Sequence, residues 1–133
     1  MRVVVHVDGG ARGNPGPAAS AAVVSAPDGT VLDEASQLLG ETTNNVAEYS
    51  GLLLGLQRAR ALGATEVEVV NDSELVARQI NGTYKVKSPD MRSLHRRAME
   101  LLASFDAWHV RSVPRARNAA ADELVNRALD GDV

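Results

Sequence analysis

The spacing of apolar and polar residues divides the chain into short strands and helices. Five segments are rich in β-branched or alternating apolar residues and are expected to form strands: 3–8, 19–26, 30–39, 66–71 and 108–113. Four segments repeat apolar residues at helical spacing and are expected to form helices: 43–62, 73–80, 88–104 and 119–129. Pro27-Asp28-Gly29 predicts a tight hairpin turn, because Asp-Gly favours the positive φ that such turns need.

This order of elements indicates an α/β domain. The first three strands, joined by hairpins, are expected to pair antiparallel, and the last two to join in parallel through helical crossovers. We therefore expect a mixed five-stranded sheet, three antiparallel strands and then two parallel strands, with helices on both faces. No repeat or linker-like segment interrupts the pattern, so residues 1–133 are expected to form a single domain.

The helix expected over residues 43–62 carries a charge on its apolar arc. Thr43 or Asn44 can cap its start, and Gly63 can end it. Glu48 shares a broad face with a set of mostly apolar residues: Tyr49, Leu52, Gly55, Leu56, Ala59 and Leu62. Because an unpaired buried charge is costly, Glu48 is expected to need a metal ion, a basic partner or a raised pKa. Gly51 and Gly55 would let this helix approach the sheet closely.

Three further carboxylates lie where a structural role competes with a chemical one. Asp8 ends the first expected strand and opens a glycine-rich segment, where it could be a turn residue. Asp72 could cap the helix that follows it, and Asp122 could interact with the dipole of the last helix. Together with Glu48 they suggest one all-oxygen cluster, which suits Mg²⁺ or Mn²⁺. Two such ions about 4 Å apart are a common device for attack on a phosphodiester.

Composition and charge narrow the classes of function. The chain has no cysteine, which excludes disulfides, zinc–thiolate sites and thiol nucleophiles. No apolar run approaches the roughly 18 residues of a membrane span, and no signal peptide is evident, so a cytoplasmic protein without membrane association is expected. The formal net charge of −3 argues weakly against a nucleic-acid partner. Two bound divalent ions would turn that charge into +1.

The positive charges and the glycine-rich loop offer candidate phosphate contacts. Lys85 and Lys87 lie together in one segment, and Arg115 with Arg117 forms a second cluster. The loop at residues 9–16 has neither a Gly-x-Gly-x-x-Gly register nor a following Gly-Lys-Ser/Thr, so it is not a familiar nucleotide cradle. Its backbone donors suit a sugar–phosphate backbone, although a plain hairpin connection is the alternative. The three histidines, His6, His95 and His109, are expected to be structural.

Four segments resemble, in order, the motifs of type 1 ribonuclease H: residues 7–16, 43–49, 71–76 and 118–125. The first two motifs are highly specific, the last two are weak alone, and the resemblance covers essentially the whole chain. It implies a ribonuclease H-like fold and an endonuclease that hydrolyses the RNA strand of RNA–DNA hybrids, leaving 5′-phosphate and 3′-hydroxyl ends. A groove that requires the 2′-hydroxyl would explain the choice of strand.

The resemblance also implies roles for individual residues. Asp8 would bridge two Mg²⁺ ions, for which Mn²⁺ can substitute, while Glu48 and Asp72 complete the shell of one ion and Asp122 holds the other. The substrate contacts that it implies are Gly9, Arg12, Asn14, Thr43, Asn44, Asn45, Ser73, Lys85, Lys87, Arg115 and Asn118.

The chain departs from the well-known bacterial branch of that family in three respects. The loop at residues 113–118 has no histidine, and Arg115 or Asn118 is the candidate substitute. The long basic protrusion is missing, which leaves residues 84–87 as the only candidate segment for holding the hybrid, and no accessory hybrid-binding domain is expected. These details resemble the ribonuclease H half of actinobacterial proteins that carry a C-terminal histidine-phosphatase domain, so a longer parent protein is one expectation. A monomer is expected.

Two other functions compete with this interpretation. One is a hybrid-binding module that has lost catalysis, which the retention of four mutually repelling acids argues against. The other is a different nuclease on the same scaffold that cuts DNA junctions or duplexes, which the compact chain and its Gly-Asn-Pro-Gly loop argue against.

Overall fold

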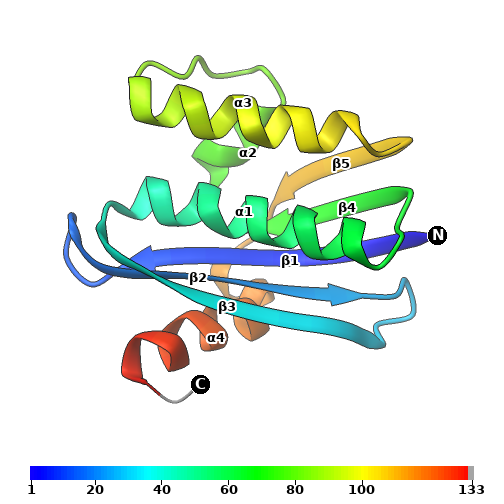
Figure 1. Cartoon of the computed structure of the whole chain (residues 1–133), viewed down its shortest axis with the longest axis horizontal. Coiled ribbons are helices and arrows are strands. Elements are labelled where there is room, and N and C mark those ends of the chain that lie inside the picture. The colour runs from blue at the N-terminus through cyan, green and yellow to red at the C-terminus, as the bar shows by residue number, and fades with distance from the viewer. Residues whose placement is uncertain (132–133) are drawn as a thin grey trace.

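The computed structural model describes residues 1–131 and shows a five-stranded sheet with helices on both faces (Figure 1). The strands are β1 (Arg2–Ala11), β2 (Gly16–Ser25), β3 (Val31–Thr42), β4 (Glu66–Asn71) and β5 (Ala107–Ser112). The helices are α1 (Asn44–Ala61), α2 (Glu74–Ile80), α3 (Pro89–Ala103), the short 3₁₀ helix η1 (Arg115–Asn118) and α4 (Ala119–Asp130). The last two residues of the expected domain, Asp132 and Val133, lie outside the described residues.

The sheet has the expected mixed topology. Its strand order is β3-β2-β1-β4-β5. β1 pairs antiparallel with β2, and β2 with β3, whereas β4 pairs parallel with β1 and β5 parallel with β4. The prediction of three antiparallel strands followed by two parallel strands is therefore confirmed.

Two apolar cores lie on opposite faces of this sheet. Helix α1 packs on one face with α2 and α3 beyond it, and α4 covers the other face (Figure 1). The larger core joins β-strand valines such as Val5 to Tyr49 and Leu56 of α1. The smaller core joins Val23 of β2 to Val125 of α4. Strand β2 is buried on both faces, which is why its apolar residues run almost without alternation.

Local signals account for the main boundaries. Gly29 has φ of +94° in the β2–β3 turn, where Thr30 N–H also donates to Asp28 Oδ1 at 2.9 Å. The Thr43 side chain accepts from Val46 N–H at the start of α1, and Gly63 has φ of +82° just beyond its end. The turn at Gly29, a cap at Thr43 or Asn44 and the end of the helix at Gly63 were predicted from the sequence.

Two sequence predictions were wrong. Strand β1 does not end at Asp8 but continues to Ala11, because it stays paired with β2 as far as Ala11 opposite Ala18. The connection between β1 and β2 is therefore residues 12–15, shorter than the expected loop at residues 9–16. Leu62 does not share the buried face of α1 and is 38% exposed, since it lies beyond the last helical residue. Among residues 1–131, no helix has the length and apolar character needed to cross a membrane.

Candidate active site

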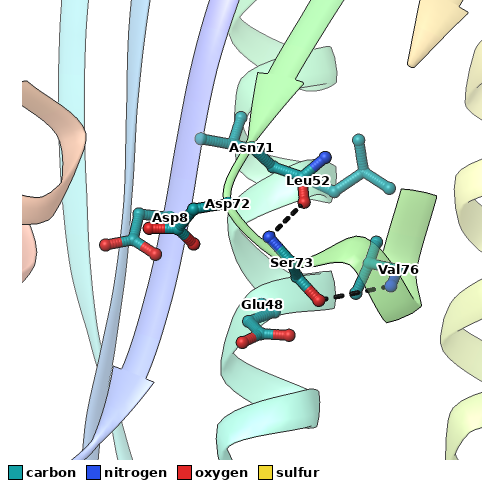
Figure 2. A pocket seen from close by; sticks show the side chains of 8 residues that line it. Asp8, Glu48, Leu52, Asn71, Asp72, Ser73 and Val76 are labelled. Atoms are coloured by element: carbon teal, nitrogen blue, oxygen red, sulfur yellow. Dashed lines mark hydrogen bonds between the residues drawn. The ribbon is translucent and has the colours of Figure 1, made fainter. Parts of the chain in front are cut away.

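Four carboxylates from four separate parts of the chain line one cleft. Asp8 comes from β1, Glu48 from α1, Asp72 from the β4–α2 connection and Asp122 from the first turn of α4. The cleft has a volume of about 500 Å³. A small, mostly apolar hollow shares Asp8, Glu48 and Asp72 with the cleft, and Figure 2 shows it from close by. Residues 114 positions apart in the chain thus meet at one place on the sheet.

Asp8 owes its position to the unequal lengths of β1 and β4. The parallel pairing of these strands ends at His6 opposite Val70, whereas β1 continues through Asp8 in its pairing with β2. Asp8 therefore lies just beyond the end of the parallel half of the sheet. This is the carboxyl end of β4, where ligands commonly bind in α/β sheets.

Three glycines bring α1, and with it Glu48, against β1. A Cβ atom on Gly9 would lie 2.0 Å from the Ala47 carbonyl oxygen, and one on Gly51 would lie 2.4 Å from the Asp8 carbonyl oxygen. A Cβ on Gly55 would lie 2.6 Å from methyl groups of Val5 and Val7. Helix and strand are therefore closer than any side chain would allow, as expected for Gly51 and Gly55.

The turn that carries Asp72 is held by its neighbours rather than by Asp72 itself. Ser73 caps α2 by accepting from Val76 N–H at 3.2 Å, and Ser73 N–H donates to Asn71 Oδ1 at 2.7 Å (Figure 2). The buried Asn71 side chain also donates to the Arg111 carbonyl at 3.1 Å. The alternative interpretation of Asp72 as the cap of α2 is therefore wrong, and its carboxylate lines the cleft instead.

Asp122 is held near β1 through η1. The Asn118 side chain is 1% exposed and donates to the Val7 carbonyl at 2.8 Å, which ties the start of α4 to the strand that carries Asp8. From η1, Arg115 Nη2 reaches Asp122 Oδ1 at 2.9 Å. Arg115 also lines the cleft.

The crowding of these acids changes the protonation of Asp8 and Glu48. Burial, reinforced by the negative charges of Asp72 and Asp122, raises the pKa of the Asp8 carboxyl to about 8. Burial also raises the pKa of Glu48, with a further contribution from Asp72 and an opposing hydrogen bond from Ser73. The raised pKa values of Asp8 and Glu48 show that this part of the cleft is short of positive charge, and a divalent cation would supply it.

The metal-free protein should consequently lose stability as pH rises from 7 towards 9. Over this range folded Asp8, with its pKa of about 8, keeps a proton that the unfolded chain has already released. The free energy of unfolding therefore falls with pH and levels off above the folded pKa. His6, whose pKa is lowered by burial and by Arg111, has the opposite slope only below its ordinary value of 6.5. Urea unfolding in chelator at pH 7, 8 and 9 measures the effect, and stability that rises over this range would contradict it.

The donor set fits Mg²⁺ or Mn²⁺, with one structural qualification. All four side chains offer carboxylate oxygens, the ligands that these hard cations prefer. Within residues 1–131, however, no three Asp, Glu or His side chains are arranged as a complete ligand set for one ion. Mg²⁺ in phosphate-handling sites is commonly held by only one or two carboxylates, with water and substrate oxygens filling the remaining positions. The shared cleft suits this kind of site.

The expected substrate contacts divide into those at the cleft and those away from it. Those that line it, besides the acids, are Gly9, Arg12, Asn44 and Arg115. Arg12 forms an ion pair with Asp130, in which Nη1 lies 2.6 Å from Oδ1. Asn44 accepts from Ala11 N–H at 2.7 Å, which fixes the start of α1 to the end of β1.

Other expected contacts lie at the margin of the cleft. Asn14 accepts from Asn44 N–H at 3.1 Å, Thr43 caps α1, and Asn45 is exposed beside them. Ser73 lines the small hollow that shares Asp8, Glu48 and Asp72 with the cleft. Lys85 and Lys87 are exposed in the α2–α3 connection and do not line the cleft.

Asn118 does not fit its expected role as a substrate contact. Its side chain is buried and hydrogen-bonded to β1, so substrate cannot reach it without opening this junction. As the substitute for the missing loop histidine, only Arg115 lies at the cleft.

Sequence reasoning missed part of the cleft wall contributed by α4. Val125, Asn126 and Leu129 line the cleft with Asp122. Their spacing of three, four and seven residues from Asp122 places them on one helical face, so the helical period from Asp122 was the available signal. It also missed the buried hydrogen bond of 2.7 Å from Tyr49 Oη to Gln79 Oε1, which joins α1 to α2.

Comparison with known proteins gives consistent results. The reverse transcriptase-like family model matches residues 6–128. A bifunctional protein of Mycobacterium tuberculosis is 52% identical over 131 residues, which cover 98% of this chain but 36% of that protein. The chain thus spans about a third of the length of this curated relative.

Solved structures extend the likeness to the whole fold. The N-terminal RNase H domain of the M. tuberculosis protein, solved as a fusion with maltose-binding protein, superposes with a TM-score of 0.96 at 50% identity, covering 99% of this chain and 96% of that one. RNase H1 from Halobacterium salinarum gives 0.96 at 44% identity, covering 98% and 99%. LC11-RNase H1 in complex with an RNA/DNA hybrid gives 0.93 at 42% identity, covering 97% of each chain. The chain therefore belongs to the ribonuclease H family, in its type 1 branch.

Proposed function

We propose that this domain hydrolyses the RNA strand of RNA–DNA hybrids at the cleft formed by Asp8, Glu48, Asp72 and Asp122. The observation that carries the proposal is the convergence of these four carboxylates, from three elements and one connection, in one cleft of about 500 Å³. The relative LC11-RNase H1, which has the same fold, was solved with an RNA/DNA hybrid. The prediction of a single domain over residues 1–133 is part of this proposal.

The finer mechanism that we propose uses two Mg²⁺ ions, with Mn²⁺ able to substitute. Bound there, the ions would activate the attacking water and neutralise charge on the phosphate in the transition state. Asp72 and Asp122 are both close enough to Asp8 to raise its pKa, which supports a bridging role for Asp8. Glu48 and Asp72 would hold one ion and Asp122 the other. The products would carry 5′-phosphate and 3′-hydroxyl ends.

The chain's own residues would orient the substrate. Arg12 and Arg115 both line the cleft, where their guanidinium groups can contact phosphates. Asn14, Asn44 and Thr43 present a polar edge at the start of α1 that can follow a minor groove and its 2′-hydroxyls. Cytoplasmic location, a monomeric state and a C-terminal phosphatase domain in a longer parent stay predictions.

The substrate panel that tests this proposal compares four end-labelled nucleic acids of the same sequence in Mg²⁺: RNA–DNA hybrid, single-stranded RNA, double-stranded RNA and duplex DNA. We expect cleavage of the hybrid alone, and only in its RNA strand. Binding without cleavage would favour the non-catalytic module, and cleavage of DNA would favour a different nuclease on this scaffold.

Removing the two lysines should weaken substrate binding more than chemistry. Lys85 and Lys87 are exposed outside the cleft, so they can contact only distant phosphates. We expect Lys85→Ala with Lys87→Ala to raise KM about three- to tenfold, most strongly at low salt, with a smaller change in kcat. Arg96→Ala with Arg97→Ala on α3 removes the same charge elsewhere and is the control. An unchanged KM would exclude the lysine segment from the substrate site.

A further inference from the structure

Arg115 forms an ion pair with Asp122, and this contact affects the binding of a cation there. Its Nη2 atom lies 2.9 Å from Asp122 Oδ1, and both side chains line the same cleft. An oxygen that accepts a hydrogen bond from a guanidinium is less available to a cation, and the positive charge of Arg115 also repels one. The contact therefore stands in the way of an ion at Asp122.

The two ends of this pair differ in their freedom to move. The Asp122 side chain is 26% exposed and lies in the first turn of α4, whereas the Arg115 side chain is 74% exposed at the rim of the cleft. The backbone beneath Arg115 is anchored by the buried Asn118, which donates to the Val7 carbonyl at 2.8 Å. The Arg115 guanidinium can thus move away from Asp122 while the Arg115 backbone stays fixed beside β1. Exposed ion pairs of this kind are weak enough for a divalent cation to displace.

We propose that Arg115 is the internal counter-ion of Asp122 in the metal-free protein, and that a divalent cation binding at Asp122 displaces it towards the substrate phosphate. The inference rests on the metal site of the proposed function. It makes Arg115 and the cation competitors for one carboxylate before substrate arrives. It also couples the cation to substrate binding, because the ion frees a guanidinium at the rim of the cleft where a phosphate would lie.

Arg117 provides a matched control. It lies in the same 3₁₀ helix, two residues from Arg115, and lines a different hollow together with residues of the β2–β3 turn. Arg117→Gln therefore removes the same charge from the same short helix while leaving the contact with Asp122 in place.

The test is calorimetric titration of the metal-free protein with Mn²⁺ alone, without nucleic acid. We expect Arg115→Gln to bind Mn²⁺ about three- to fivefold more tightly than the native protein, the range that loss of an exposed ion pair allows. Arg117→Gln should change the affinity less than twofold, because only a distant charge is lost. Arg115→Lys, which keeps the charge, should stay close to the native value. Thermal melting in chelator checks that each variant is folded.

Each outcome bears on one claim. Equal or weaker Mn²⁺ binding by Arg115→Gln would overturn the competition, as would an equal gain in Arg117→Gln, which would show a general charge effect. Absence of Mn²⁺ binding by the native protein would instead contradict the metal site of the proposed function. A second readout is the ¹⁵N NMR signal of Arg115 Nε, assigned by its loss in Arg115→Lys. We expect it to shift on addition of Mg²⁺ to the native protein, and a signal that stays unchanged at saturating Mg²⁺ would also overturn the displacement.

Discussion

Replacing Asp8 by asparagine is expected to reduce cleavage of the hybrid by at least about 10³-fold, equivalent to about 4 kcal/mol of transition-state stabilisation. Asp8 is the acid whose pKa responds to both Asp72 and Asp122, so it is the carboxylate best placed to share two cations. Asparagine keeps the size of the side chain but loses the charge that would bind them. Binding of the hybrid should persist. The measurement is single-turnover cleavage at saturating enzyme, with binding followed separately.

The same substitution should stabilise the metal-free protein. Asp8 is only 8% exposed, and its pKa of about 8 shows that the fold disfavours its ionised form. A neutral amide removes this cost, and we expect a gain of about 1–3 kcal/mol in the free energy of unfolding at pH 8 in chelator. Asp106→Asn, an exposed acid between α3 and β5, is the control and should give no gain. Asp8→Asn that still cleaves within tenfold of the native rate, or that destabilises the metal-free protein, would contradict this account of Asp8.

Substituting alanine for Gly9 should have the second large effect, on both folding and cleavage. The new Cβ would lie 2.0 Å from the Ala47 carbonyl oxygen and 2.6 Å from Glu48 N, both backbone atoms of α1. The helix can only relieve this overlap by moving away from β1, which carries Glu48 away from Asp8. We expect a loss of about 3 kcal/mol in stability, and about 10²-fold slower cleavage from an ångström-scale displacement.

Gly10 supplies the control for this test. A Cβ there would have Val125 Cγ1 at 3.9 Å as its nearest neighbour, which is ordinary packing distance. Gly10→Ala should therefore change stability by less than about 1 kcal/mol. Urea unfolding and cleavage assays on the two variants give the comparison. Equal effects of the two substitutions would show that close packing of α1 on β1 does not position Glu48.

Much of the fold could be predicted because its signals are local. Asp28-Gly29, the Thr43 cap and Gly63 each specify a turn or a boundary within a few residues, and the structure has all three. The end of β1 could not be predicted in this way. Gly9 and Gly10 have the composition of a loop, yet they remain paired with β2 while Gly9 makes room for α1. That requirement comes from a helix about 40 residues later in the chain.

The candidate site shows the same division between local and distant information. The position of Glu48 on an apolar helical face is a local signal, and the helical period alone indicates an interior carboxylate there. The ion pair between Arg12 and Asp130 joins residues 118 positions apart, and the Asn118–Val7 hydrogen bond spans 111 positions. Contacts of this range depend on the complete packing of α4. This is why Asn118 was expected at the substrate and instead lies inside the protein.

One cleavage assay tests the central claim most directly. It compares the native protein in chelator with the same protein after Mg²⁺ is added back, and it identifies the chemical ends of the products. We expect no cutting of a labelled RNA–DNA hybrid in chelator. Re-addition of Mg²⁺ should restore cutting in the RNA strand alone and yield fragments with 5′-phosphate and 3′-hydroxyl ends. Cutting that persists in chelator, or products with 2′,3′-cyclic phosphate ends, would contradict metal-ion hydrolysis at the four-carboxylate cleft.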